Sequence, residues 1–167
     1  MTIAIRAELP GDALAIRDVT RAAFQNAPVA SHTEHYIVDA LRDAGALVIS
    51  LVAEEGENIV GHVAVSPVAI EGAADWFGLG PISVLPERQR QGIGSALMRS
   101  AIDALRARGA KGCALVGDPA YYARFGFEPA APMVLPGIPP EAFQALVLSG
   151  AKPSGTLRFH EGFEATG

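Results

Sequence analysis

The chain has 167 residues, half of which are hydrophobic, and a formal net charge of -5. This length and composition predict one domain over residues 1–167 with a substantial core. The acidic balance argues against a nucleic-acid partner, because nonspecific binding needs a basic surface that displaces counterions. No apolar run approaches the roughly 18 residues of a membrane span and the N-terminus lacks a signal-peptide layout, so we expect a cytoplasmic protein with no membrane partner.

The N-terminal part of the chain shows strand and helix patterns in turn. Residues 2–7 alternate as a strand does, and residues 12–24 place Ile16, Val19, Ala23 and Phe24 on one helical face. Residues 34–43 predict a second helix. The β-rich runs 47–53 and 59–70 flank the polar, glycine-containing turn 54–58, which indicates a β-hairpin.

The next predicted strand, residues 75–84, contains the pair Gly80-Pro81. Glycine has no side chain and proline has no N–H, so this pair predicts a bulge. A strand distorted there can splay from a parallel neighbour at residues 112–117. Its backbone around Ile82 and Val84 then becomes available to an extended ligand.

A crossover helix is expected between these two strands, as parallel pairing requires. Gly109 is its expected C-cap, and its apolar stripe comprises Ile93, Leu97, Met98, Ala101, Ile102 and Leu105. Beyond Phe127, five prolines within residues 129–140 predict a loop. Residues 143–148 and 156–160 supply further strands with a turn at 150–155 between them, which completes a mixed α/β pattern in one sheet.

The most informative segment is 84–95, where a strand end leads through a glycine turn into that helix. Gly92 and Gly94 let the backbone approach a ligand closely, and the first amides of the helix have no intrahelical partner. These donors and the positive end of the helix dipole favour phosphate or pyrophosphate. A dinucleotide fingerprint would need a third glycine where Leu97 stands, and a P-loop would need a Gly-Lys-Ser/Thr triplet that the chain lacks.

Charge is unevenly distributed around this turn. Residues 87–111 carry a net charge of +4 and the rest of the chain carries -9. A basic patch beside the glycine turn suits a phosphorylated ligand, although a solvated helix face explains Arg106 and Arg108 equally well.

Two motifs resemble those of the GNAT superfamily of N-acetyltransferases. The first is Gln89-x-x-Gly92-x-Gly94, preceded by Val84-x-Pro86, which is similar to the acyl-CoA motif of that superfamily. The second, residues 117–127, is similar to a short helix of that superfamily that ends in a Tyr-x-x-x-Gly-Phe pattern. Its Gly-Asp-Pro-x-Tyr-Tyr sequence resembles the YhbS-like subgroup. The strong correspondence covers residues 79–127.

The resemblance implies a GNAT-type single domain, α/β (α+β mixed), with a central mixed β-sheet of splayed parallel strands flanked by helices. It also implies acetyl-CoA as co-substrate, with the pantetheine arm bonded along the splayed strand and the pyrophosphate on the main-chain amides of residues 91–96. The expected cofactor-binding residues are Ile82, Ser83, Val84, Gln89, Arg90, Gln91, Gly92, Ile93, Gly94, Ser95, Ala96, Asp118 and Phe125.

The resemblance places Tyr122 at the family tyrosine that protonates the leaving thiolate, with Tyr121 as the weaker candidate. The alternative for Tyr122 is a ring packed in the core with its hydroxyl at the edge. Asp118 and Pro119 form an expected N-cap and first helical residue, so Asp118 is a cap rather than a reactant. Gln89 either fixes the turn or hydrogen-bonds a phosphate oxygen, and the splayed backbone can polarise the thioester carbonyl.

The sequence does not specify the base that deprotonates the amine. His32, Glu34, His35 and His62 are the candidates. We expect the first three at the surface at a helix start, whereas His62 either lines the substrate cleft or is a satisfied residue of the sheet. The four histidines and Cys113 show no ligand spacing, so we expect no metal, and Cys113 lies in an apolar run that predicts burial.

Together these patterns predict an acetyl-CoA-dependent N-acetyltransferase. A primary amine, on a small molecule or a peptide, attacks the thioester directly in a ternary complex. One alternative is a non-catalytic module that binds or senses acyl-CoA, and another is a GNAT enzyme that uses a different acyl-CoA. The sequence leaves open the identity of the amine, the acyl-chain preference and the formation of a homodimer.

Overall fold

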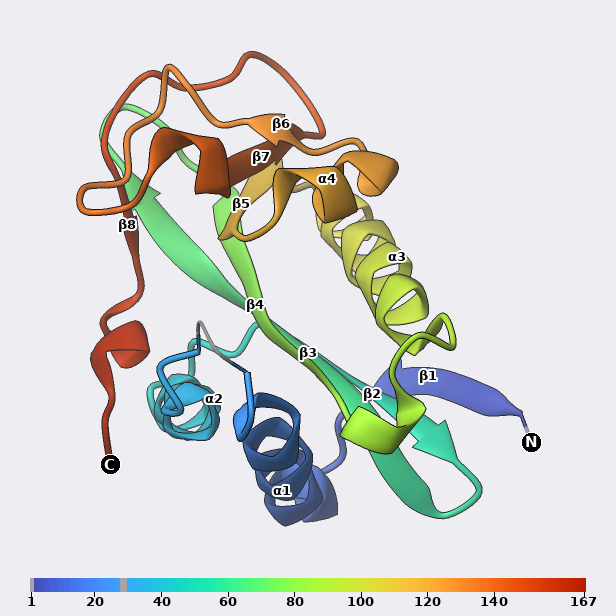
Figure 1. The fold of residues 1–167 in the computed structure, drawn as a ribbon. Helices are drawn as coiled ribbons and strands as arrows, with labels where there is room; N and C mark the ends of the chain where they lie inside the picture. Colours follow the sequence, from blue (N-terminus) through green and yellow to red (C-terminus); the bar gives the residue numbers. More distant parts are fainter. Residues whose placement is uncertain (1, 28–29) are drawn as a thin grey trace.

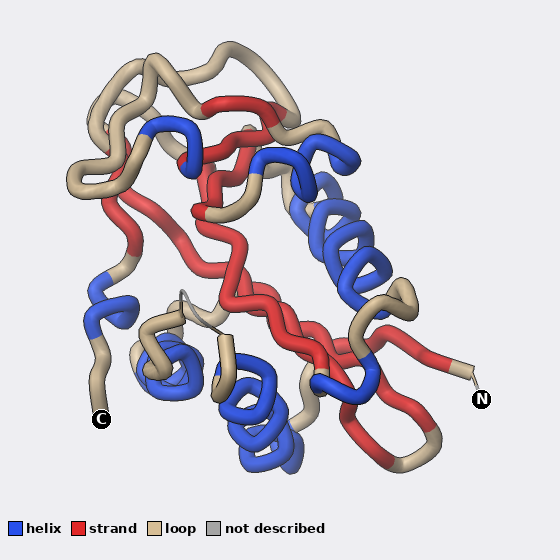
Figure 2. Tube along the Cα trace, in the orientation of Figure 1, coloured by secondary structure: helices blue, strands red, loops and turns tan. Residues whose placement is uncertain are grey.

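The structure, a computed structural model, describes residues 2–27 and 30–167. In these residues eight strands form one mixed sheet (Figure 1, Figure 2). Along the sheet the strands follow the order β1-β2-β3-β4-β5-β7-β6, and β8 pairs with β3. Their bounds are β1 Ile3–Ala7, β2 Ile49–Glu55, β3 Asn58–Ile70, β4 Trp76–Val84, β5 Gly112–Val116, β6 Glu128–Pro129, β7 Phe143–Val147 and β8 Leu157–Phe159. The mixed α/β fold class predicted from the sequence is confirmed.

The N-terminal half of the sheet is antiparallel throughout. β1 pairs with β2, β2 with β3, and β3 with β4. The β2–β3 turn contains Gly56 at a φ of 62°, a conformation that glycine adopts without steric cost. The predicted hairpin is therefore confirmed, and β2 begins and ends two residues later than the sequence pattern indicates.

Helices cover both faces of the sheet (Figure 1). α1 (Ala13–Phe24) and α2 (Glu34–Asp43) lie together on one face, and α3 (Ile93–Ala107) lies on the other. On the α1–α2 face, Ile16, Val38 and Val52 form a buried cluster. Burial of each such side chain stabilises the fold by roughly 1.5–3 kcal/mol. The helices on the two faces therefore both stabilise the sheet.

The predicted apolar stripe of α3 lies in the main core of the molecule. All six of its members are buried: Ile93, Leu97, Met98, Ala101, Ile102 and Leu105. The C-cap is Arg108, one residue before the predicted Gly109. Gly109 follows it with a φ of 77°, and the Ala110 amide donates to the Leu105 carbonyl at 3.0 Å, which ends the helix. This helix therefore brings the glycine turn at its N-terminus to a fixed place beside β4.

β4 carries the predicted distortion. Val63 faces Ile82 across the β3–β4 pair, whereas Val65 faces Leu79, so this stretch has one more residue on β4 than on β3. The extra residue falls at the predicted pair, where Gly80 has a φ of 132°. A bulge of this kind bends the strand and increases its twist.

The parallel pair of strands separates beyond this point. β4 pairs with β5 only over 76–78, opposite 112–114. From Leu79 to Val84, β4 keeps β3 on one side, and among the described residues it has no strand partner on the other. The predicted open edge is therefore present next to the N-terminus of α3, and its main-chain groups can bind an extended ligand.

The two predicted C-terminal strands are present, but they do not pair with each other. β7 lies between β5 and β6, whereas β8 pairs with the far end of β3. The segment 150–155 therefore joins two separate parts of the sheet. The proline-rich segment is a loop except for β6 and a single 3-10 turn at Pro140–Ala142. Pro129 fits in β6 because that strand forms the edge of the sheet, where a missing N–H is tolerated.

Candidate functional site

A cavity of about 570 Å³ lies between the open edge of β4, the N-terminus of α3 and the short helix α4 (Pro119–Tyr122). It is lined by Ile82, Val84, Arg88, Gln89, Arg90, Gly92, Gly94, Ser95, Tyr121 and Arg124. The two predicted motifs, which are well separated in the sequence, therefore border the same cavity.

The glycine turn is held in a conformation that favours glycine at position 92. Gly92 is the N-cap of α3 and has a φ of 84°. A Cβ there would have open space, so the backbone angle and not crowding explains this glycine in the protein alone. Gly94 differs, because a Cβ there would lie 3.4 Å from the Tyr121 hydroxyl, on the cavity side of the helix.

The amides that precede the first helical bond are the donors of this site. The Ala96 amide already donates to the Gly92 carbonyl at 3.0 Å, so regular α3 bonding begins there. The amides of Ile93, Gly94 and Ser95 come before it and lie at the positive end of the helix dipole. Ile93 can contribute only its backbone, because its side chain is buried in the core.

The two glutamines of the first motif stabilise the turn. The Gln89 side-chain amide donates to the Val84 carbonyl at 3.1 Å, and the Gln91 side-chain amide donates to the Glu87 carbonyl at 3.3 Å. Both bonds link the turn to the segment before it. Of the two roles predicted for Gln89, the structure contains the bond that fixes the turn.

Three arginines give the cavity its positive charge. Arg90 was predicted, whereas Arg88 and Arg124 were not predicted as site residues. Arg88 also pairs with Glu55, a buried carboxylate on β2. The Arg124 guanidinium stacks over the Tyr121 ring at 4.4 Å from the centroid, which holds it at the cavity wall.

The second motif forms the cap and helix that the sequence predicts. The Asp118 carboxylate accepts from the Ala120 amide at 3.0 Å, and Pro119 occupies the first helical position. After α4, one 3-10 turn ends at Gly126, which has a φ of 95°. Asp118 is therefore a cap in this structure, and the cap orients the two tyrosines that follow it.

The two adjacent tyrosines occupy different surroundings. Tyr121 borders the cavity, whereas Tyr122 packs against the main core and over Gly117, where a Cβ would overlap the Tyr122 ring. Burial, and then the charges of Tyr121 and Asp118, raise the pKa of Tyr122 to about 12. Its hydroxyl therefore stays protonated at neutral pH, a state that can donate a hydrogen bond.

The cavity contains half of the predicted set of site residues. Ile82, Val84, Gln89, Arg90, Gly92, Gly94 and Ser95 line it. The remaining predicted residues do not line it and are Ser83, Gln91, Ile93, Ala96, Asp118, Phe125 and Tyr122. Phe125 packs edge-on against Tyr121 and under the Arg99 guanidinium, so it supports α4 from behind.

The candidate bases are scattered over the α1–α2 side of the molecule. His32 is exposed and Glu34 bonds the Ser31 amide at 3.0 Å, as expected at a helix start. The surface prediction is wrong for His35, which is buried because it faces the core side of α2, and burial lowers its pKa. His62 does not line a cleft, since its side chain is 0% exposed.

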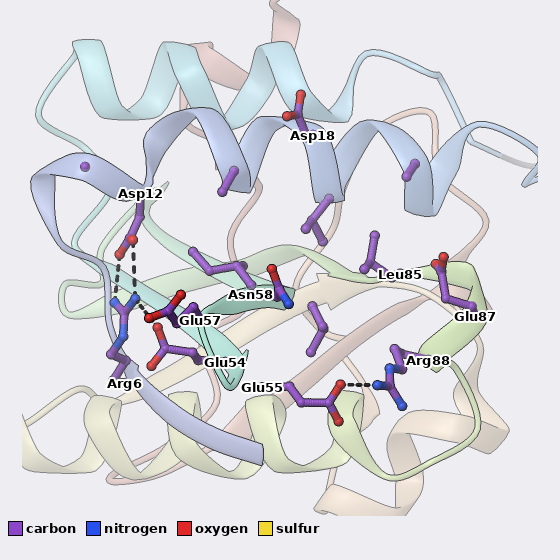
Figure 3. Close-up of a pocket in the computed structure, with 16 residues that line it drawn as sticks. Arg6, Asp12, Asp18, Glu54, Glu55, Glu57, Asn58, Leu85, Glu87 and Arg88 are labelled. Atoms are coloured by element: carbon purple, nitrogen blue, oxygen red, sulfur yellow. Dashed lines mark hydrogen bonds and ion pairs between the residues drawn. The ribbon is translucent and has the colours of Figure 1, made fainter. Parts of the chain in front are cut away.

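A larger cavity, of about 770 Å³, lies on the other side of the segment 85–88 (Figure 3). Its wall is strongly acidic and includes Asp12, Asp18, Glu54, Glu55, Glu57 and Glu87. Figure 3 shows Arg6 paired with Asp12 and Glu54, and Arg88 paired with Glu55. None of the residues that line this larger cavity comes from the bulge of β4, from α3 or from α4.

Residues 2–27 and 30–167 contain no group of three or more His, Cys, Asp or Glu side chains that could hold a metal ion. None of their helices is both long and apolar enough to cross a membrane. Cys113 is buried as predicted, and burial raises the pKa of its thiol to about 12.

Known proteins resemble this chain in both sequence and fold. A family model described as an acetyltransferase (GNAT) domain matches residues 47–129. YhbS of Escherichia coli K12, described as an uncharacterized N-acetyltransferase, is 38% identical over 129 residues, which are 76% of this chain and 74% of YhbS.

Two crystal structures agree with this match. A GNAT family acetyltransferase from Brucella melitensis, in complex with acetyl-CoA, is 47% identical and has a TM-score of 0.87 over 97% of this chain and 98% of its own. Escherichia coli YhbS, in complex with CoA, is 35% identical and has a TM-score of 0.88 over 99% of this chain and 93% of its own. The chain therefore belongs to the GNAT family of N-acetyltransferases and is YhbS-like.

Proposed function

We propose that this GNAT protein transfers the acetyl group of acetyl-CoA to a primary amine, by direct attack of the amine on the thioester in a ternary complex. The observation that carries the proposal is the junction of the open β4 edge with the N-terminus of α3 in one basic cavity. The complexes of the two related proteins with acetyl-CoA and CoA support the same ligand here.

The diphosphate of CoA belongs on the amides of Ile93, Gly94 and Ser95. These amides and the helix dipole favour an anion, and the three cavity arginines add positive charge. The pantetheine arm then follows β4 from Val84 toward the bulge as an added strand, because the main chain of β4 is unpaired on that side. This course leads the thioester toward the point where β4 and β5 separate.

The chemistry needs a polarised carbonyl and a stabilised leaving thiolate. Main-chain amides near the bulge are suited to the first role, because donors aimed at a developing oxyanion are most effective where water is excluded. Tyr122 does not line the cavity, but its ring packs over Gly117 at the end of β5, the strand from which β4 separates, and we assign the second role to its hydroxyl. With a pKa of about 12 against about 8.5 for a thiol, complete proton transfer from Tyr122 would cost about 5 kcal/mol, so a strong hydrogen bond to the sulfur is the favoured role.

The decisive experiment combines binding with turnover. Calorimetric titration with CoA and acetyl-CoA measures the cofactor site, and an amine library scored by released thiol and product mass finds the acceptor. We expect tight CoA binding and acceptor-dependent thiol release. Comparison of acetyl-, propionyl- and succinyl-CoA tests the acyl group. Normal CoA binding with no acceptor-dependent release would identify a binding or sensing module instead.

A further inference from the structure

Two arginines lie against neighbouring aromatic rings beside the cofactor cavity. The Arg124 guanidinium is 4.4 Å from the centroid of the Tyr121 ring, and the Arg99 guanidinium is 5.2 Å from the centroid of the Phe125 ring. The two rings pack edge to face, with centroids 5.6 Å apart and planes at 64°. We call these four residues, from α3, α4 and the turn after it, the arginine wall.

The arginine wall adjoins the amides at the N-terminus of α3. A Cβ at Gly94 would lie 3.4 Å from the Tyr121 hydroxyl, and both Tyr121 and Arg124 line the cofactor cavity. Ser95 also lines this cavity, and Arg99 follows it by four residues on the same face of α3. The wall therefore lies next to the proposed diphosphate site, on its α4 side.

Both guanidinium groups are held in place but are not neutralised. Arg124 Nε also donates to the Tyr121 carbonyl at 3.0 Å. Over the part of the chain that the structure describes, neither Arg99 nor Arg124 forms an ion pair with a carboxylate. Asp103 is one turn further along α3, at a spacing that allows a pair, yet Arg99 lies over Phe125 instead. In a chain with a net charge of -5, this arrangement favours an anionic ligand.

The opposite side of the diphosphate site is less favourable for a second anion. Arg88 is paired there with the buried Glu55 and borders the acidic cavity, which Glu87 also lines. Arg90 belongs to the turn that leads into the diphosphate amides. The carboxylates of the acidic cavity repel a phosphate, whereas no acidic residue is among the described residues that line the cofactor cavity.

CoA carries phosphate at two separate places. The diphosphate joins the pantetheine arm to the adenosine, and a phosphate monoester is attached to the 3′ oxygen of the ribose. Since the pantetheine arm leaves the diphosphate along β4 in the proposed complex, the ribose and its phosphate continue from the other end of the diphosphate. A phosphate monoester carries roughly -1.5 to -2 charges at pH 7 and three acceptor oxygens.

We propose that the arginine wall binds the 3′-phosphate of the acyl-CoA donor, an assignment that rests on the proposed acetyl transfer. Arg124, which lines the cavity, donates to the phosphate oxygens, because a planar guanidinium matches them in geometry and charge. Arg99 adds its charge from α3. The wall therefore selects donors that carry this phosphate over pantetheine donors that lack it.

The test compares two ligands that differ only in this phosphate. Calorimetric titration of the whole protein with CoA and with 3′-dephospho-CoA gives the ratio of their affinities. We expect wild-type protein to bind CoA about tenfold more tightly, the range for two exposed ion pairs. Arg124→Gln should lower the ratio to about threefold, Arg99→Gln should lower it less, and the double variant should bring it close to one. Affinity for 3′-dephospho-CoA should stay within about twofold of wild type in all three.

Matched controls separate the wall from general charge and from the turn. The Arg108 guanidinium also lies over a ring, 5.6 Å from the Phe77 centroid, but Arg108 is the C-cap of α3 and does not line the cavity. Arg108→Gln should therefore leave the ratio unchanged. Arg90→Gln should weaken both ligands equally. If Arg90→Gln abolishes the preference for CoA and the wall variants keep it, the 3′-phosphate lies at the turn and the proposal is wrong.

Phosphorus NMR of the bound cofactor supplies a second measurement. At saturation, binding should shift the 3′-phosphate resonance of CoA in wild-type protein but not in the double variant, while the diphosphate resonances shift in both. Equal shifts of the 3′-phosphate in the two proteins would overturn the assignment. If wild-type protein does not bind CoA, the proposed function and the wall both fail; if it binds CoA and 3′-dephospho-CoA equally, the wall alone fails.

Discussion

The rings of Tyr121 and Tyr122 meet edge to face, with centroids 4.9 Å apart and planes at 89°. This geometry is a preferred aromatic arrangement, and it points the two side chains of one helical turn in different directions. Tyr121 turns toward the cofactor cavity, whereas Tyr122 turns toward the core and the end of β5. The two hydroxyl groups therefore have separable roles.

The first prediction concerns these hydroxyls. Tyr122→Phe keeps the ring on Gly117 and removes only the donor, so acetyl-CoA affinity should hold while turnover falls by about 10²-fold. Tyr121→Phe is the matched control and should change turnover far less. Both are measured by thiol release and calorimetry with an accepted amine. Wild-type turnover in Tyr122→Phe across the pH range would assign this residue to packing alone.

The second prediction concerns the glycine turn. Gly92→Val imposes a branched side chain on a φ of 84° at the anion site, so the folded variant should lose CoA binding in calorimetry. Gly56→Val is the matched control, because Gly56 has a similar φ of 62° and equally open surroundings but lies in the β2–β3 turn. Both variants should lose stability, and only Gly92→Val should lose CoA affinity. Equal CoA affinity in the two would remove this turn from the cofactor site.

Much of the fold can be predicted from local sequence patterns. The α3 stripe repeats at helical spacing, and every member is buried because one helical face meets the sheet. The bulge follows from Gly80-Pro81 because glycine provides no side chain and proline provides no N–H. These features depend on neighbouring residues, which is the information that a single sequence carries well.

The rest of the site depends on tertiary contacts that no spacing encodes. Arg124 and Tyr121 border the cavity only because α4 lies over the open edge of β4. The hydrogen bonds that link His62 on β3 through Ser50 on β2 to Glu8 follow from strand register rather than from any motif. The pairing of β8 with β3 likewise could not be predicted, since a short strand fits several edges.

The third prediction concerns the phosphates of the cofactor. The cavity presents main-chain amides and arginines, so CoA should bind far more tightly than pantetheine, and its affinity should fall as ionic strength rises. Arg124→Ala should weaken CoA binding and flatten the salt dependence, while leaving pantetheine binding unchanged. Titrations between 50 and 500 mM salt, roughly spanning Debye lengths from 14 to 4 Å, measure both effects. Equal affinity for CoA and pantetheine would place the phosphates elsewhere.

The fourth prediction concerns Arg88, which borders both the cofactor cavity and the acidic cavity of Figure 3. Glu55 holds this guanidinium from the acidic side, so its charge competes with the cofactor phosphates for Arg88. Glu55→Gln keeps the shape of the side chain and removes the charge, and we expect CoA to bind several-fold more tightly with a steeper salt dependence.

Glu54→Gln supplies the control for this competition. Glu54 lines the same acidic cavity but pairs with Arg6, so the change removes equal charge without releasing Arg88. It should therefore leave CoA affinity nearly unchanged. Because Glu55 is buried, thermal unfolding of both variants is measured alongside the calorimetric titrations. If the two variants strengthen CoA binding equally, the effect comes from general charge and not from Arg88; if Glu55→Gln weakens binding, the ion pair positions Arg88 for the cofactor instead of competing with it.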